Sequence, residues 1–220
     1  MSKIFFLLAL IGFAVTPSWS LDSWFSAELP IGSKKYPITA RIHTQKFGDT
    51  LKFSTETQYR GADTSFSMHS TGAFNVKTNL PIWQNSIRDG LYSVEWSFRD
   101  WTEKPAALYW RGTIGDGSLT FENDAVPEEF LYFIAEKIDP AKPFLDFKVL
   151  SPVWEVPFEP NAWTATAQFT NRKQRIQGVD CYQVFFTRSD GKIAEYYLTE
   201  KGRQVWRFQT FRGMWFERVQ

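Results

Sequence analysis

The chain has 220 residues, of which 25 are Lys or Arg and 24 are Asp or Glu, so its formal net charge is +1 at pH 7. A charge this near zero, with no basic stripe, argues against nucleic acid as a partner and against strong attraction to anionic lipid. Aromatic residues make up 18% of the chain, and Cys181 is the one cysteine. A single thiol excludes an internal disulfide, so stability must come from packing, to which buried aromatic rings contribute most.

The first twenty residues have the layout of a secretory signal peptide. A lysine precedes an apolar run over residues 4–15, and the small residues Ser18 and Ser20 stand before a cleavage point at Leu21. The apolar run is shorter than the ~20 residues that a membrane-spanning helix needs. We therefore expect cleavage near Ser20 and a periplasmic or secreted protein in which residues 21–220 form a single β-rich domain.

The first half of that domain alternates apolar and polar residues, which is typical of strands with one covered and one solvated face. The pattern is clearest in LYSVEWSFRDW, residues 91–101, and recurs in PITARIHTQKF and TLKFSTETQY. The apolar members of these three segments are Tyr92, Val94, Trp96 and Phe98; Ile38, Ala40 and Ile42; and Leu51, Phe53 and Tyr59. His43 and His69 fall on the polar faces, so we expect both at the surface.

One segment, VPEEFLYFIAEKI over residues 126–138, has helical spacing instead. Glu128 and Glu129 suit the positive end of the helix dipole, and Asp139 and a following proline end the segment. The apolar side contains Phe130, Leu131, Ile134, Ala135 and Ile138, while Glu129, Glu136 and Lys137 fall toward the other side. An isolated helix shorter than ~12–15 residues is marginal in water, so we expect this one to dock on the aromatic face of the sheet.

The last third predicts an antiparallel meander. Its strands cover residues 179–188, 192–199, 203–211 and 214–219, and the turns between them contain Asp-Gly, Lys-Gly and Arg-Gly. Glycine favours such turns because their central residues take positive φ. Cys181 lies in the first strand, where we interpret it as a small, half-buried hydrophobe. The proline-rich residues 140–160 are expected to be a long connection within the domain.

The sequence contains no motif for catalysis or for metal binding. HxH, HExxH and CxxC spacings are absent, as is a G-x-S-x-G nucleophile elbow. Gly115, Asp116 and Gly117 form a turn signal without the following helix that a phosphate loop needs. We therefore expect a protein that is not an enzyme and that uses no metal or cofactor.

The C-terminal segment QGVDCYQVFFTRSDGKIAEYYLTEKGRQVWRFQTFRGMWFERV resembles the C-terminal meander of an exported bacterial family, the domain of unknown function 3108. The positions that carry the resemblance are Gly178, Tyr182, Val184, Tyr197, Leu198, Gly202, Val205, Phe208 and Phe216. It implies a fold similar to the periplasmic lipoprotein carriers, in which helix covers the hollow of a half-barrel. That family has no assigned function, so no catalytic residue carries over. The single helix here departs from the carriers and argues against a lid-like opening motion.

These observations predict a mainly β fold: a single curved, unclosed antiparallel sheet, or half-barrel, with one amphipathic helix packed on its concave face. Our first hypothesis is that the hollow binds an apolar ligand such as a lipid or acyl chain. The residues predicted to line it are Tyr92, Val94, Trp96, Phe98, Phe130, Ile134 and Ile138.

Two alternatives remain open at this level. The domain could be a structural or interaction module with a filled core, which would bind an envelope protein through an edge strand or a surface patch. It could also be an outer-membrane β-barrel, although the helix, the proline-rich middle and the polar stretch STETQ argue against this. The sequence carries no signal for the ligand's identity, the pathway or the oligomeric state.

Overall fold

The computed structural model describes residues 19–31, 33–61, 65–78, 80–89, 94–99, 106–113, 115–121, 125–151 and 161–219. The predicted signal peptide lies outside the described residues except for its last two positions, Trp19 and Ser20. These two residues begin the first strand and pair with Lys46 and Gln45. The described residues contain no helix of the length and apolar character that a membrane crossing requires.

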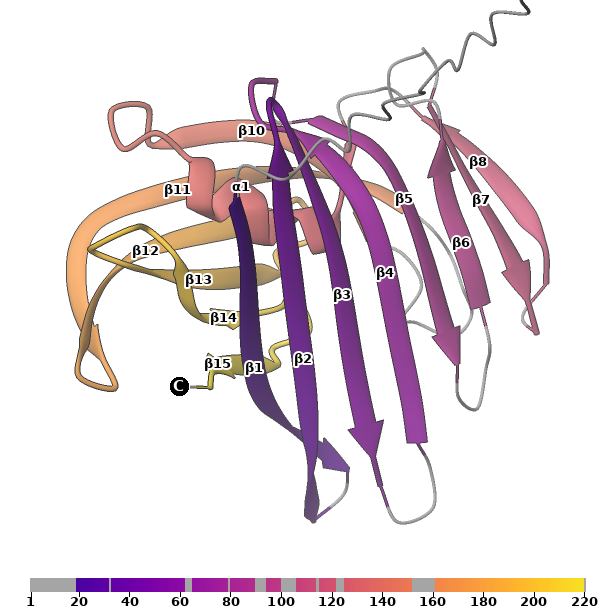
Figure 1. Cartoon of the computed structure of the whole chain (residues 1–220), viewed down its shortest axis with the longest axis horizontal. Coiled ribbons are helices and arrows are strands. Elements are labelled where there is room, and N and C mark those ends of the chain that lie inside the picture. The colour runs from indigo at the N-terminus through magenta and orange to yellow at the C-terminus, as the bar shows by residue number, and fades with distance from the viewer. Residues whose placement is uncertain are drawn as a thin grey trace, which may run out of the picture.

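The described part of the chain forms fifteen strands and one short helical segment (Figure 1). The strands are β1 (Trp19–Ile31), β2 (Lys34–Phe47), β3 (Thr50–Arg60), β4 (Ser65–Asn75), β5 (Leu80–Asp89), β6 (Val94–Arg99), β7 (Ala106–Gly112), β8 (Gly117–Phe121), β9 (Ala125–Pro127), β10 (Phe144–Ser151), β11 (Asn161–Ile176), β12 (Val179–Arg188), β13 (Ile193–Thr199), β14 (Val205–Gln209) and β15 (Trp215–Arg218). The helical segment consists of a 3-10 turn, η1 (Glu128–Phe130), and the α-helix α1 (Leu131–Lys137).

All fifteen strands belong to one sheet in the order β8-β7-β6-β5-β4-β3-β2-β1-β15-β14-β13-β12-β11-β10-β9. Neighbouring strands are antiparallel, except that β9 and β10 are parallel. The sheet curves so strongly that β10–β14 run at a steep angle to β1–β5, and α1 lies between these two halves (Figure 1). β8 and β9 are the ends of the sheet and do not pair in the described residues. The predicted curved, unclosed sheet with a helix in its hollow is therefore confirmed.

The core contains a cluster of aromatic rings between the two halves of the sheet. Phe53 on β3 contacts Phe130 and Phe133, with ring centroids 5.0 and 5.2 Å apart. Phe25 on β1 contacts Tyr132 of the helix at 6.0 Å and Phe208 of β14 at 5.2 Å, both edge to face. Edge-to-face contact at such separations is the favoured arrangement of aromatic pairs. The helix thus joins the inner faces of both halves.

The helical segment begins later than its sequence pattern predicts. Val126 and Pro127 are extended and pair with β10, and the α-helix proper begins at Leu131. Every residue from Leu131 to Ala135 is buried, because sheet covers the helix on more than one side. Lys137 is exposed as expected, whereas Glu129 was expected on the solvated side and instead has both carboxylate oxygens buried.

The predicted C-terminal meander is confirmed in β12 to β15. The turn glycines Gly191 and Gly213 have φ values of 83° and 79°, which a residue with a Cβ rarely adopts. Cys181 in β12 is fully buried. The prediction for residues 140–160 is wrong in part, because β10 occupies the first half of that range and pairs along its length with β11. The alternation of apolar and polar residues in this segment favours a strand, and the prolines lie on either side of the strand rather than within it. Residues 152–160 lie outside the described residues.

A candidate ligand-binding cavity

A cavity of about 330 Å³ lies in the hollow of the sheet, beside the start of the helical segment. Its apolar lining consists of Leu29, Ile38, Ala40, Ile42, Phe66, Met68, Phe208, Met214 and Phe216. Its other lining residues are Thr55, Thr57, Arg88, Glu128, Glu129, Tyr132, Tyr196, Thr210 and Arg212. Both halves of the sheet and the helical segment contribute, so the cavity exists because the sheet is folded around the helix.

Strand alternation explains the wall formed by β2 and β3. Ile38, Ala40 and Ile42 point inward because they alternate with outward-facing residues. In the cross-strand register, Ala40 is opposite Thr57 and Ile42 is opposite Thr55. Opposite residues of an antiparallel pair share a face, so both threonines point into the hollow. The polar stretch STETQ therefore supplies one polar wall of the cavity.

Glu129 is a carboxyl group of the cavity whose pKa differs from its value in solution. Both of its carboxylate oxygens are buried, and neither has a hydrogen-bond partner of normal geometry among the described residues. Burial raises the pKa of this carboxyl to about 7, and the nearby Glu128 carboxylate adds to the effect, while Arg212 opposes it. Near neutral pH the group therefore exists in both the protonated and the ionised form.

Other polar groups of the cavity also lack partners. The hydroxyl oxygens of Thr55 and Thr210 are buried and have no hydrogen-bond partner among the described residues. Tyr132 and Tyr196 are buried beside the glutamates, and burial raises the pKa of each phenol above its ordinary value of 10.0. Unmet hydrogen-bonding capacity inside a protein is unusual and calls for an explanation. A ligand in the cavity would provide one.

The two arginines of the cavity are already engaged. The guanidinium of Arg88 lies over the ring of Phe66, 5.4 Å from its centroid. Burial lowers the pKa of Arg88, and a guanidinium keeps its charge in proteins. Arg88 and Arg212 both take part in further interactions within the protein. They contribute positive charge to the cavity.

A chain of buried polar side chains lies on β4 and β5, close to Glu129. The amide nitrogen of Gln84 donates to the hydroxyl of Ser86 at 3.0 Å, and that hydroxyl donates to Ser70 at 2.8 Å. All three side chains are essentially inaccessible to solvent. The amide of Gln84 is close enough to Glu129 to oppose the rise of its pKa. The polar character of the cavity therefore continues into the sheet behind it.

Of the seven residues that the sequence predicts to line the ligand site, the structure describes the side chains of three. Tyr92 lies outside the described residues, and the side chains of Val94, Trp96 and Phe98 on β6 are not described. Phe130, Ile134 and Ile138 belong to the packed core, with exposures of 0%, 3% and 5%. They are not among the residues that line the cavity, and their contact with a ligand stays a prediction. The helical segment contributes Glu128, Glu129 and Tyr132 to the lining instead.

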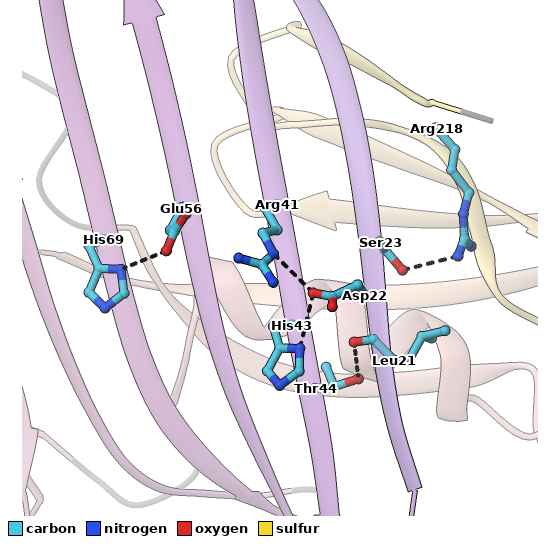
Figure 2. A network of polar contacts seen from close by, with 9 residues as sticks. All are labelled: Leu21, Asp22, Ser23, Arg41, His43, Thr44, Glu56, His69 and Arg218. Carbon is cyan, nitrogen blue, oxygen red and sulfur yellow. Dashed lines mark hydrogen bonds and ion pairs between the residues drawn. The ribbon is translucent and has the colours of Figure 1, made fainter.

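The outer face of the sheet carries a separate polar network, which Figure 2 shows. Asp22 accepts a hydrogen bond from Nε of Arg41 at 3.0 Å and lies 3.0 Å from Nδ1 of His43. Nδ1 of His69 on β4 lies 4.0 Å from Oε1 of Glu56 on β3. Arg41 holds the pKa of Asp22 below its ordinary value. Solvent screens these exposed pairs, and exposed ion pairs contribute little to stability.

Among the described residues, neither the two histidines nor Cys181 lines the cavity. In that part of the chain no group of three or more His, Cys, Asp and Glu residues is placed to hold a metal ion. Burial raises the pKa of the Cys181 thiol to about 11, so the thiol is protonated at neutral pH. The cavity is therefore the strongest candidate for a functional site.

Comparison with known proteins supports the fold. A crystal structure of a beta-barrel-like protein of domain of unknown function DUF1849 from Brucella abortus superimposes with a TM-score of 0.59. The two sequences are 9% identical, and the match covers 94% of this chain and 98% of that chain.

No protein-family model and no curated protein matches this sequence. The resemblance to the domain of unknown function 3108 family is therefore not supported. At 9% identity the solved structure shows a shared fold alone. This chain thus has the barrel-like fold of a domain of unknown function, and such a fold is consistent with a ligand-binding cavity.

Proposed function

We propose that this protein is an exported, non-catalytic binding protein that holds an apolar ligand, such as a lipid or acyl chain, inside its curved sheet. The observation that carries the proposal is the cavity of about 330 Å³ with a mainly apolar lining. Small-molecule sites are typically clefts of ~300–1,000 Å³ lined mostly by apolar and aromatic side chains. Its size therefore suits a small ligand or a single chain of a larger one.

Packing energetics support the same function. An unfilled apolar cavity costs stability, because the atoms that line it lose van der Waals contacts on one side. The chain could fill this space with larger residues at Ala40, Thr55 or Thr57, yet it keeps small ones there. The cavity also favours ligand binding over the alternative of an interaction module with a filled core. The signal-peptide pattern of residues 1–20 supports a periplasmic or secreted location.

Native mass spectrometry can test the proposal. The full chain would be exported with its own N-terminal segment, purified without detergent and measured before and after organic extraction. We expect an added mass in the native spectrum and an apolar compound in the extract. A spectrum with the bare polypeptide mass alone, and an extract with no such compound, would contradict the proposal.

A pair of variants on one strand links the ligand to the cavity. Ala40→Phe places a ring in the cavity, and we expect it to reduce the bound fraction strongly. Thr39→Phe adds the same ring one residue away on the exposed face of β2, and should leave the bound fraction unchanged. Equal occupancy in both variants would place the ligand elsewhere.

A further inference from the structure

We propose that the ligand is an amphiphile whose head group donates hydrogen bonds, an amine or an alcohol, and that this head group lies against Glu129. The inference rests on the proposed function, because it names the class of ligand that the same cavity takes. It differs from the expectation of a free fatty acid, whose ionised head group only accepts hydrogen bonds.

The first argument is the unmet capacity of Glu129. Its two carboxylate oxygens are buried at the cavity and lack hydrogen-bond partners of normal geometry among the described residues. A buried carboxylate normally has donors around it, because burial without them is costly. A ligand head group with N–H or O–H donors would supply what is missing. An anionic head group would add a like charge instead.

The second argument is the state of the cavity's other charges. Arg88 and Arg212 could in principle hold an anion, but both already interact within the protein, as does Glu128. Arg88 in addition lies over the ring of Phe66. Four charged residues line the cavity, and Glu129 is the one with buried acceptor atoms that have no hydrogen-bond partner among the described residues.

The third argument is the arrangement of the remaining groups. The Thr55 and Thr210 hydroxyls are also buried without partners, and a hydroxyl can accept a hydrogen bond from the same head group or donate one to it. Apolar side chains such as Ile38, Ala40 and Phe216 line the same cavity and would contact the ligand's body. Acceptors at the helical segment and apolar walls elsewhere match an amphiphile rather than a wholly apolar molecule.

The experiment compares three probes with the same ten-carbon chain: decylamine, decanol and decanoate. The full-length exported protein is first stripped of ligand by extraction and refolding. Binding is then measured at pH 8 by calorimetry, at concentrations below those at which the probes form micelles. We expect decylamine and decanol to bind at least about tenfold more tightly than decanoate, because a hydrogen bond to a charged group is worth a factor of about 10 to 100.

Two variants assign the preference to one residue. Glu129→Gln keeps the shape and removes the negative charge, and it should reduce the preference for decylamine over decanoate about tenfold or more. Glu28→Gln changes a carboxylate that is 63% exposed on β1, and it should leave the preference unchanged. Circular dichroism confirms that each variant is folded.

The outcomes separate this inference from the proposed function. If none of the probes binds the folded protein, the proposed function fails and the inference fails with it. If all three bind but decanoate binds as tightly as the others, the cavity holds ligands and the inference alone is wrong. A preference for amine that persists in Glu129→Gln would also overturn it, because the head group would then lie elsewhere.

Discussion

The Nη2 atom of Arg203 donates a hydrogen bond to the backbone carbonyl of Ile138 at 2.7 Å. That carbonyl belongs to the residue that caps α1, so a side chain from the turn between β13 and β14 holds the C-terminal end of the helix. The backbone N–H of Val205 adds a second link by donating to the Glu136 carboxylate at 3.2 Å. The helix is thus fixed to the C-terminal half of the sheet by polar contacts as well as by aromatic packing.

Replacing Arg203 by Met should destabilise the protein by about 1–3 kcal/mol, because a partly buried carbonyl loses its charged donor. Met keeps much of the stem that packs beside the ring of Phe169, which the guanidinium now covers at 5.0 Å. Urea denaturation measures the change. Lys201→Met removes an exposed charge from the same turn and serves as the control. Equal stability of the two variants would mean that the hydrogen bond contributes nothing.

The raised pKa of Glu129 predicts how stability depends on pH. The folded protein binds this proton with a pKa of about 7, against an ordinary value of 4.5. The folded state therefore holds the proton more tightly than the unfolded state. Stability is fully present below pH 4.5, falls as the pH rises toward 7, and is constant above it. The whole loss amounts to about 3 kcal/mol.

Glu129→Gln should remove most of this dependence. The variant should match the wild type near pH 4.5 and exceed its unfolding free energy by about 3 kcal/mol at pH 8. Burial also raises the pKa of Glu136, so a smaller dependence of the same sign remains. Denaturation in urea at both pH values measures the difference. A variant with the same pH dependence as the wild type would show that Glu129 is solvated in the folded state.

Gly72 on β4 lies beneath the ring of Phe53. A Cβ at this position would be 2.5 Å from the Phe53 ring and 2.8 Å from the backbone oxygen of Trp83. Such contacts are too short, so Gly72→Ala should cost about 1–3 kcal/mol in unfolding free energy. The double variant with Phe53→Leu should lose less than the sum of the two single changes, since the smaller side chain relieves one overlap. Strict additivity would contradict this account.

Cys181 should be inert in the folded protein. The side chain is fully buried, and burial raises the pKa of its thiol to about 11. A disulfide reagent at pH 8 should react on the order of 100-fold more slowly with the folded protein than with the protein in urea, because reaction requires local opening and a thiolate. A spectrophotometric assay of the released thiol follows both rates. Similar rates would show that the strand opens freely.

Much of the fold follows from the sequence because its signals are local. The meander of β12 to β15 has strict alternation and glycine turns, and each of these depends only on neighbouring residues. The buried set Ile38, Ala40 and Ile42 was predicted in the same way. Docking of the helix in the hollow followed from its apolar arc and its short length.

The cavity could not be predicted in the same way. The turn at Glu128–Phe130 is a 3-10 turn rather than part of the α-helix, so Glu129 points in a different direction than it would in an ideal α-helix. The spacing of about 100° per residue therefore assigns Glu129 to the wrong side. Thr55 shares its strand parity with Leu51 and Phe53, which is the one signal that it points inward. The position of the cavity depends on how two distant halves of the chain pack against each other. The spacing of residues along the sequence carries no information about that packing.

The strand order has a consequence for how the chain can be rewired. β8 and β9 follow one another in sequence yet lie at opposite margins, whereas β1 and β15, at the far ends of the described chain, pair through Phe25 with Arg218 and Ser26 with Glu217. All other pairings join strands consecutive in sequence. A circular permutant that links residue 219 to residue 19 and opens between 121 and 125 would make every pairing local, and low contact order speeds folding.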